Sequence, residues 1–143
     1  MTGQFTPPVS VIIPVRNAAR TLKSTIESVL NQTYSEIIEI ILSIGPSNDQ
    51  TLIIAKDLQG LDPRIKIITN TSGKTARGLN LAAQIASGQY FVRVDSHCRL
   101  TENYIKFAVD KITETGAGNV GGIQRAAGES IFQKSIAAAM SSK

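Results

Sequence analysis

The sequence predicts an α/β domain in which a doubly wound, mostly parallel sheet carries helices on both faces. Short apolar runs rich in β-branched residues alternate along the chain with longer segments whose apolar residues recur at helical spacing. The apolar runs are continuous, which is typical of parallel strands that are buried on both faces. A length of 143 residues, of which 42% are hydrophobic, suits one domain with a substantial core.

The first half of the chain supplies two strand–helix pairs. Residues 9–15 (VSVIIPV) are predicted to form a buried strand, and a helix follows with Asn17 as its N-cap. Residues 36–44 are predicted to form the second strand, which ends at the turn GPSND. A helix over residues 51–59 follows, with Gly60 at its C-cap position.

The middle of the chain continues the alternation. Residues 65–69 are predicted to form a third strand, and the segment TARGLNLAAQIAS a third helix that Gly88 ends. The segment QYFVRV is the fourth predicted strand.

The last third is predicted to hold two helices with a short strand between them. Thr101 caps a helix that Gly116 closes, since the apolar residues between them fall on one face. Residues 119–124 (NVGGIQ) are predicted to form a fifth, shorter strand, and a helix is expected from Ser130 to the end. Nothing in the sequence repeats.

Composition limits the partners and the compartment. The net charge of +4 suits anionic partners such as phosphates or an acidic membrane surface, or simply solubility. The basic residues are scattered and aromatic residues make up only 5%, so nucleic acid is not expected as a partner. A single cysteine, no apolar run that could cross a bilayer and no signal-peptide pattern predict a cytoplasmic protein.

The strand-to-helix loops are the candidate binding positions. Ligands of doubly wound sheets bind beyond the carboxyl ends of the strands. The loop after the fourth predicted strand is the richest in chemistry, because Asp95 and Ser96 are followed there by His97 and Cys98, the only histidine and cysteine of the chain. Cys98 is interpreted as a packing residue, and Arg93 either pairs with an acid at the sheet edge or serves the site.

Two nucleotide-binding motifs differ from these loops in specific residues. A dinucleotide fingerprint is excluded, because the segment PVRNAAR after the first strand has no glycine. The segment SGKT, Ser72 to Thr75, resembles the end of a phosphate-binding P-loop, but that motif needs a glycine where this chain has Ile68. A P-loop-like site at Ser72 to Thr75 is therefore kept only as the less favoured alternative.

An ordered set of segments resembles the donor-binding half of a family 2 glycosyltransferase. The set comprises VSVIIPVRNAARTLKSTIESVLNQTY, the second strand and its turn, and GLNLAAQIASGQYFVRVDSH. Enzymes of that family have the GT-A fold, which is Rossmann-like. The resemblance covers nearly the whole chain, and its specificity comes from the order of the pieces.

The resemblance implies which residues bind the donor and a metal. It places residues at the ends of the first two strands near the base, and residues around the third helix near the diphosphate. The D-x-D positions bind the ribose and a Mn²⁺ or Mg²⁺ ion. Two departures are visible: Ile44 and Gly45 stand where the family has an aspartate that recognises uracil, and His97 stands at the last D-x-D position. The implied donor-binding residues are Pro14, Val15, Asn17, Gly45, Lys74, Asn80, Asp95 and Ser96, and the implied metal ligands are Asp95 and His97.

The resemblance also implies an activity. It points to an inverting transferase that moves a sugar from a nucleotide-diphosphosugar, a UDP-sugar above all, to a saccharide or lipid-linked acceptor in cell-envelope polysaccharide synthesis. The enzyme would work in the cytoplasm, at the inner face of the membrane. Residues 1–143 would form its donor-binding part, with the general base beyond Lys143 and Glu129 as a weak candidate. The alternative is a catalytically silent module that binds sugar nucleotides.

Overall fold

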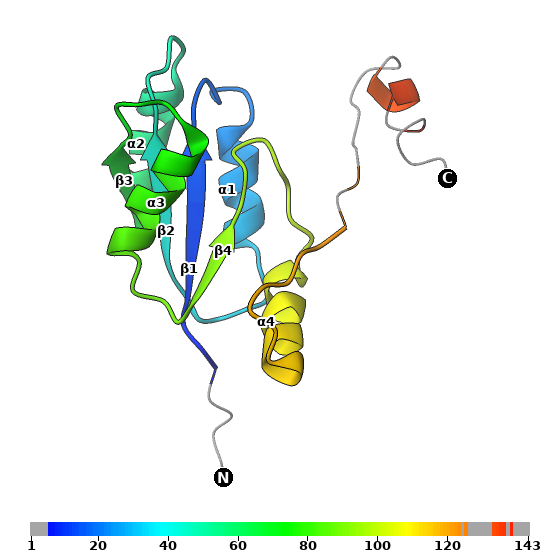
Figure 1. Ribbon diagram of the computed structural model, residues 1–143. Helices are drawn as coiled ribbons and strands as arrows, with labels where there is room; N and C mark the ends of the chain where they lie inside the picture. Colours follow the sequence, from blue (N-terminus) through cyan, green and yellow to red (C-terminus); the bar gives the residue numbers. More distant parts are fainter. Residues whose placement is uncertain (1–5, 124, 126–132, 137, 139–143) are drawn as a thin grey trace.

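The computed structural model describes residues 6–123, 125, 133–136 and 138. Its elements are β1 (Val9–Val15), α1 (Leu22–Leu30), β2 (Ile37–Ile44), α2 (Thr51–Leu61), β3 (Ile65–Thr69), α3 (Thr75–Ile85), β4 (Tyr90–Arg93) and α4 (Tyr104–Thr115). The four strands form one parallel sheet in the order β3-β2-β1-β4 (Figure 1).

This strand order makes the sheet doubly wound, as the sequence predicts. The chain moves outward from β1 to β2 and β3, then returns to the other side of β1 to form β4. Right-handed crossovers in opposite directions lie on opposite faces of a sheet. Accordingly α3 covers one face, and α1 and α2 cover the other (Figure 1). The predicted α/β class is confirmed.

The core has one layer on each face of the sheet. On the larger side, Val11 and Ile13 of β1 are fully buried together with residues of α1, α2 and α4, of which Ile26 and Ile105 are examples. On the smaller side, Ile12 and Ile41 pack against Ala82 of α3. Because β1 and β2 are buried on both faces, their sequences show no polar alternation.

One prediction at the C-terminal end differs from the structure. The fifth strand is wrong over residues 119–123, which form no strand, and residue 124 lies outside the described residues. Gly121 and Gly122 leave this segment few side chains that could pack on the sheet. Of the last predicted helix, residues 133–136 and 138 are helical, and its other residues lie outside the described part of the chain. No helix of the described residues is long and apolar enough to cross a bilayer.

Helix boundaries also differ from the predicted ones. Asn17 is not an N-cap, since α1 begins after Thr21. Gly60 lies inside α2 rather than at its end, and α3 ends at Ile85, before Gly88. The N-cap of α4 is Asn103 rather than Thr101. Gly116 closes α4 as predicted, in the left-handed conformation at φ 66°.

A buried carboxylate joins β2 to the segment before β4. Glu39 is 1% exposed and accepts hydrogen bonds from Lys66 Nζ at 2.6 Å, Ser10 Oγ at 2.5 Å and the Ser87 amide at 2.6 Å. Burial alone would raise the pKa of Glu39, but the bonds from Lys66, Ser10 and Ser87 outweigh it and lower that pKa to about 2. The Gly88 amide donates to Ser10 Oγ, so the network also holds the start of β4 in place.

Candidate functional site

A hollow of about 200 Å³ opens at the carboxyl ends of β1 and β4. These two neighbouring strands mark the point where the strand order reverses, which is where doubly wound sheets bind their ligands. Residues at the ends of three strands and in the loops that follow them line it: Pro14, Val15, Arg16, Asn70, Gly73, Thr75, Asp95, Ser96 and His97.

The loops after β1 and β2 are linked by hydrogen bonds. Asn17 adopts a left-handed conformation at φ 47°, donates its amide to Ser47 Oγ and accepts from the Asn48 amide at Oδ1. Arg16 Nε donates to the Pro46 carbonyl at 3.2 Å. Pro14 and Val15 line the hollow, whereas the Asn17 side chain joins the two loops and lies outside the lining.

Gly45 lies at the closest approach of two loops. Its amide donates to the Val15 carbonyl, and a Cβ on Gly45 would lie 3.2 Å from the Gly73 Cα. Gly45 lines a second hollow, of about 350 Å³, between the ends of β2 and β3. That hollow is mostly apolar, with Ile44, Leu52 and Ile67 in its wall.

Asp49 follows in the same turn, and its carboxylate accepts hydrogen bonds from both loops. It accepts from the Ala19 amide and from both the amide and the hydroxyl of Thr51. The Thr51 hydroxyl lowers the pKa of Asp49, and the Ala19 amide adds to the effect. Asp49 therefore stabilises the pair of loops.

The loop between β3 and α3 forms a compact turn. Asn70 is buried and donates from Nδ2 to the Lys74 carbonyl, while Ser72 Oγ donates to Asn70 Oδ1. The Gly73 amide donates to the Asn70 carbonyl and the Lys74 amide to Ser72 Oγ. A P-loop needs free amides to surround phosphates, and here those of Gly73 and Lys74 are used within the loop.

Two predicted diphosphate residues lie on or beside α3, outside the hollow. Lys74 is exposed at the N-cap of the helix, next to Gly73 and Thr75 of the lining. Asn80 is exposed farther along the helix. Lys74 is thus at the rim, and Asn80 is more distant.

The turn after β4 contributes the acid and the imidazole. Asp95 accepts from Arg93 Nε at 3.0 Å, so of the two roles considered for Arg93 the structure shows the ion pair. Ser96 is buried, and its carbonyl accepts from the hydroxyls of Thr21 and Thr25 at 2.8 and 3.0 Å. These bonds attach the turn after β4 to the start of α1.

Three potential metal ligands meet in this turn. A carboxylate oxygen of Asp95, a ring nitrogen of His97 and Cys98 Sγ all lie within 4.8 Å of one another. Oxygen, nitrogen and sulfur donors of this kind fit a divalent cation. The predicted pair of Asp95 and His97 lines one hollow, and Cys98 joins them although the sequence indicated only packing.

Four lining residues are additional to the predicted set: Arg16, Asn70, Gly73 and Thr75. Arg16 belongs to a loop that the fold class had marked as a candidate position. The others come from the loop after β3, where the resemblance implied only Lys74. A buried asparagine directly after a strand, such as Asn70, is the feature that could have identified this wall.

Curated relatives match most of the chain. The chain is 30% identical over 135 residues to the succinoglycan biosynthesis protein ExoA of Rhizobium meliloti, covering 93% of this chain and 41% of that protein. It is 40% identical over 89 residues to the UDP-Glc:alpha-D-GlcNAc-diphosphoundecaprenol beta-1,3-glucosyltransferase WfgD of Escherichia coli, covering 62% and 34%. The chain thus spans less than half the length of these relatives.

Solved structures share the fold. The mannosyltransferase PcManGT of Pyrobaculum calidifontis, in complex with GDP-Man and Mn²⁺, has a TM-score of 0.77 at 23% identity, over 85% of this chain and 37% of that one. TarS of S. aureus, residues 1–349 with UDP, has a TM-score of 0.68 at 23% identity, over 83% and 39%. The sequence pattern of the family described as glycosyl transferase family 2 matches residues 10–140. The resemblance inferred from the sequence is confirmed: this chain belongs to glycosyl transferase family 2.

Proposed function

We propose that this chain is the donor-binding part of an inverting glycosyltransferase. The enzyme transfers a sugar from a nucleotide-diphosphosugar, with UDP as the nucleotide, to a saccharide or lipid-linked acceptor in cell-envelope polysaccharide synthesis. It works in the cytoplasm, at the inner face of the membrane. Residues 1–143 supply the donor and cation sites, and the acceptor side and general base lie beyond Lys143.

The hollow at the strand-order reversal is the observation that supports this proposal most. Its wall combines Asp95 and His97 with the positively charged Arg16, and Lys74 stands at its rim. Such a wall matches a ligand that has ribose hydroxyls, a negative diphosphate and an associated cation. Among the solved relatives, TarS is in complex with UDP and PcManGT with GDP-Man and Mn²⁺.

Each predicted residue has a place in this proposal. The base lies against the first two loops, the diphosphate lies at the start of α3, and Ser96 supports the ribose beside Asp95. A Mn²⁺ or Mg²⁺ ion held by Asp95 and His97 would stabilise the negative charge of the leaving diphosphate. Pro14 and Val15, which line the hollow, contact the base, and Lys74 at its rim contacts the diphosphate. Asn17 and Gly45 shape the adjoining loops, and Asn80 lies farther along α3, beyond direct contact.

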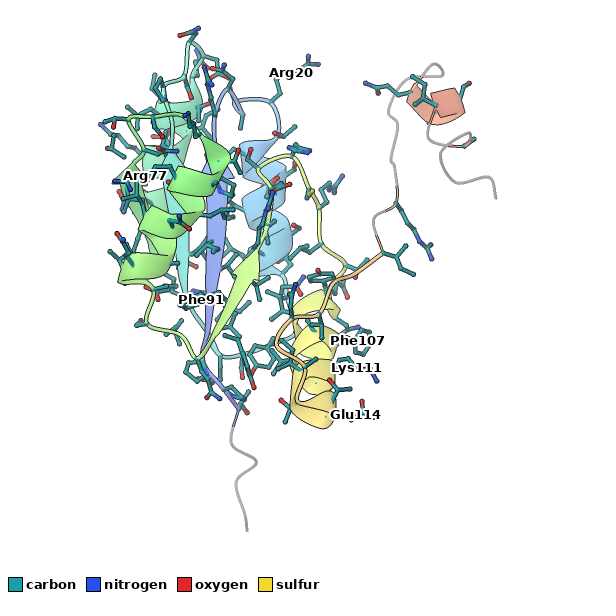
Figure 2. The ribbon with its side chains drawn as sticks, in the orientation of Figure 1. Arg20, Arg77, Phe91, Phe107, Lys111 and Glu114 are labelled. Carbon is teal, nitrogen blue, oxygen red and sulfur yellow. The ribbon has the colours of Figure 1, made fainter. Side chains whose placement is uncertain are left out.

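The described residues offer no evident general base for the transfer. An acceptor hydroxyl must lose its proton as its oxygen attacks the anomeric carbon and the diphosphate leaves. Asp110 and Glu114 are exposed on α4 and pair with Lys106 and Lys111. Figure 2 shows Glu114 at the end of the molecule opposite Arg20, which lies at the carboxyl end of the sheet. Glu102 is exposed before α4, and Glu129 lies outside the described residues.

One observation favours a second function, a silent module that binds sugar nucleotides without transferring the sugar. Among the described residues that line the hollow, Asp95 carries the only carboxylate, and it is paired with Arg93. A longer native chain with a further acidic motif would decide in favour of the enzyme.

Titration calorimetry with UDP, GDP and uridine, with and without Mn²⁺, tests the proposal. We expect UDP to bind more tightly than GDP, Mn²⁺ to strengthen UDP binding, and uridine to bind more weakly than either diphosphate. Tighter binding of GDP would contradict the assignment of the base. The absence of binding by every nucleotide would overturn the proposed function.

A further inference from the structure

We propose that Cys98 is a third ligand of the cation site and that this site selects a thiophilic divalent cation of the Zn²⁺ and Co²⁺ class over Mg²⁺. The inference deepens the proposed function and rests on it only for the use of the site. It assigns to Cys98 a role that the D-x-D pattern does not contain, and it replaces the Mn²⁺ or Mg²⁺ of the proposed function with this class of cation as the preferred ion.

The backbone geometry brings Cys98 to the site. The Cys98 amide donates to the Asp95 carbonyl at 2.9 Å, which closes a turn over residues 95–98. The Ser96 carbonyl is held by Thr21 and Thr25 of the neighbouring helix region, so the turn has a fixed path. As a result Cys98 Sγ lies within 4.8 Å of ligand atoms of both Asp95 and His97.

The separation of the three donors is close to that of one coordination sphere. Ligand bonds of about 2.0–2.3 Å place the donors of a tetrahedral ion within about 4 Å of one another. His97 is exposed, so its ring can rotate toward the other two donors without leaving a packed environment. Cys98 is half-buried at the edge of the core and supplies the fixed side of the site.

The chemistry of the donors determines which cation they prefer. Mg²⁺ takes oxygen ligands in an octahedron, and this cluster offers one carboxylate beside an imidazole and a thiol. Thiolate and imidazole ligands favour Zn²⁺ and related transition metals. Binding releases the thiol proton to solvent, so that the thiolate is the ligand. Three protein ligands leave a fourth position open, which an oxygen of the donor diphosphate can fill.

Arg93 is a competitor for the carboxylate. Its ion pair with Asp95 is solvent-accessible, with side-chain exposures of 55% and 29%, so opening it costs little. A cation that gains two further ligands from His97 and Cys98 can therefore displace the guanidinium.

Titration of the reduced chain with Co²⁺ alone tests the ligand set. We expect a thiolate-to-cobalt charge-transfer band that Zn²⁺ abolishes by displacement and that excess Mg²⁺ leaves unchanged. Cys98→Ser should lose the band and bind Zn²⁺ at least about tenfold more weakly. Loss of a residue that only supports a metal ligand already costs about tenfold, and loss of a direct ligand should cost more. Glu114→Gln, at an exposed carboxylate on α4, should retain both band and affinity. Far-UV circular dichroism checks that each variant is folded.

A second measurement uses the native sequence. Because Cys98 is the only cysteine, the rate of thiol labelling by a disulfide reagent reports on this side chain alone. Zn²⁺ should slow the labelling and Mg²⁺ should not. A Co²⁺ complex without the charge-transfer band, or equal Zn²⁺ affinity of parent and Cys98→Ser, would overturn the inference even if UDP binds. A thiolate complex in a chain that binds no nucleotide would support the inference and overturn the proposed function.

Discussion

Lys74 allows the contribution of its positive charge to diphosphate binding to be measured separately from nucleoside binding. It lies at the N-cap of α3, where the helix dipole and the ammonium group both favour a phosphate. We predict that Lys74→Ala weakens UDP binding by about 1.5–3 kcal/mol, roughly tenfold or more, and leaves uridine binding unchanged. Titration calorimetry of both ligands measures the difference.

The control for this prediction is a second exposed lysine. Lys111 lies on α4 and pairs with Glu114, far from the carboxyl end of the sheet (Figure 2). Lys111→Ala should leave UDP binding as it is. Equal losses for UDP and uridine in Lys74→Ala would show that the lysine supports the loop rather than the diphosphate.

Arg93 lowers the affinity of the site for a cation, because it pairs with Asp95. Because its guanidinium shares Asp95 with any bound ion, Arg93→Gln should tighten Co²⁺ and Mn²⁺ binding, by up to about fivefold for a solvent-accessible pair. Arg93→Lys keeps the positive charge and should stay near the parent. Calorimetric titration with each metal alone decides the matter, and weaker binding by Arg93→Gln would mean that the arginine orients Asp95 for the ion.

The sequence predicted the position of Asp95 and His97 but not that of Cys98. In an extended segment, alternate residues share a face, so residue 97 is expected beside residue 95 and residue 98 on the other side. The chain instead turns at residues 95–98, and the bond from the Cys98 amide to the Asp95 carbonyl reverses its direction. That turn depends on Thr21 and Thr25, about 70 residues earlier in the sequence, so local periodicity could not reveal it.

At the level of elements, strands were predicted more accurately than helix ends. A buried strand is defined by its own apolar run, and β1 and β3 begin and end where the sequence indicates. Helix starts depend on tertiary contacts. Asn17 is hydrogen-bonded to Ser47 and Asn48, so it does not cap a helix, and α1 begins later. The predicted fifth strand lacked a partner strand and side chains to pack.

The junction of α3 and β4 depends on one glycine. A Cβ on Gly88 would lie 2.5 Å from the Ser10 amide nitrogen and 2.8 Å from the Val9 carbonyl carbon, and both atoms belong to the part of β1 that pairs with β4. We predict that Gly88→Ala lowers the free energy of unfolding by about 1–3 kcal/mol. The midpoint of urea unfolding measures the loss.

Gly60 offers the matched comparison. It lies inside α2, and a Cβ there would meet nothing within 4 Å. Gly60→Ala should therefore raise the free energy of unfolding by about 0.5–1 kcal/mol, because alanine is the better helix former. A stabilising Gly88→Ala would show that the junction relaxes freely.

The whole molecule acquires a pH dependence from Glu39. Its pKa lies at about 2 in the folded chain against an ordinary value of 4.5, so the folded state favours the charged form. The resulting stabilisation, roughly 3 kcal/mol, is present above pH 4.5 and is lost as the pH falls toward 2. Relative to the parent, Glu39→Gln should be destabilised at neutral pH, and the difference should shrink across that interval.

Urea unfolding at several pH values measures this effect. Asp110→Asn removes an exposed carboxylate on α4 and should show no comparable dependence. A parent-to-Glu39→Gln difference that stays constant from neutral pH to pH 2 would contradict the assigned role of the buried carboxylate.

For the whole molecule, the strand order explains which predicted site residues converge. Pro14, Val15, Asp95, Ser96 and His97 end or follow β1 and β4, which are neighbours in the sheet, so they meet at one hollow. Asn80 lies six residues after Lys74 on α3, about 9 Å farther along the helix axis, and stays outside it. The resemblance implied contacts from both Lys74 and Asn80, but only the geometry of the sheet shows which predicted residues line the hollow.

The linked loops after β1 and β2 have a consequence for the thermodynamics of binding. Backbone amides of residues 17–19 are already held by Ser47, Asp49 and Thr51, and Arg16 is held by the Pro46 carbonyl. This side of the hollow is thus preorganised, and a ligand has little backbone disorder to remove there. The conformational entropy lost on binding should come from the exposed side chains of Lys74 and His97. Affinity would then depend more on how far these two side chains lose conformational freedom than on any rearrangement of the sheet.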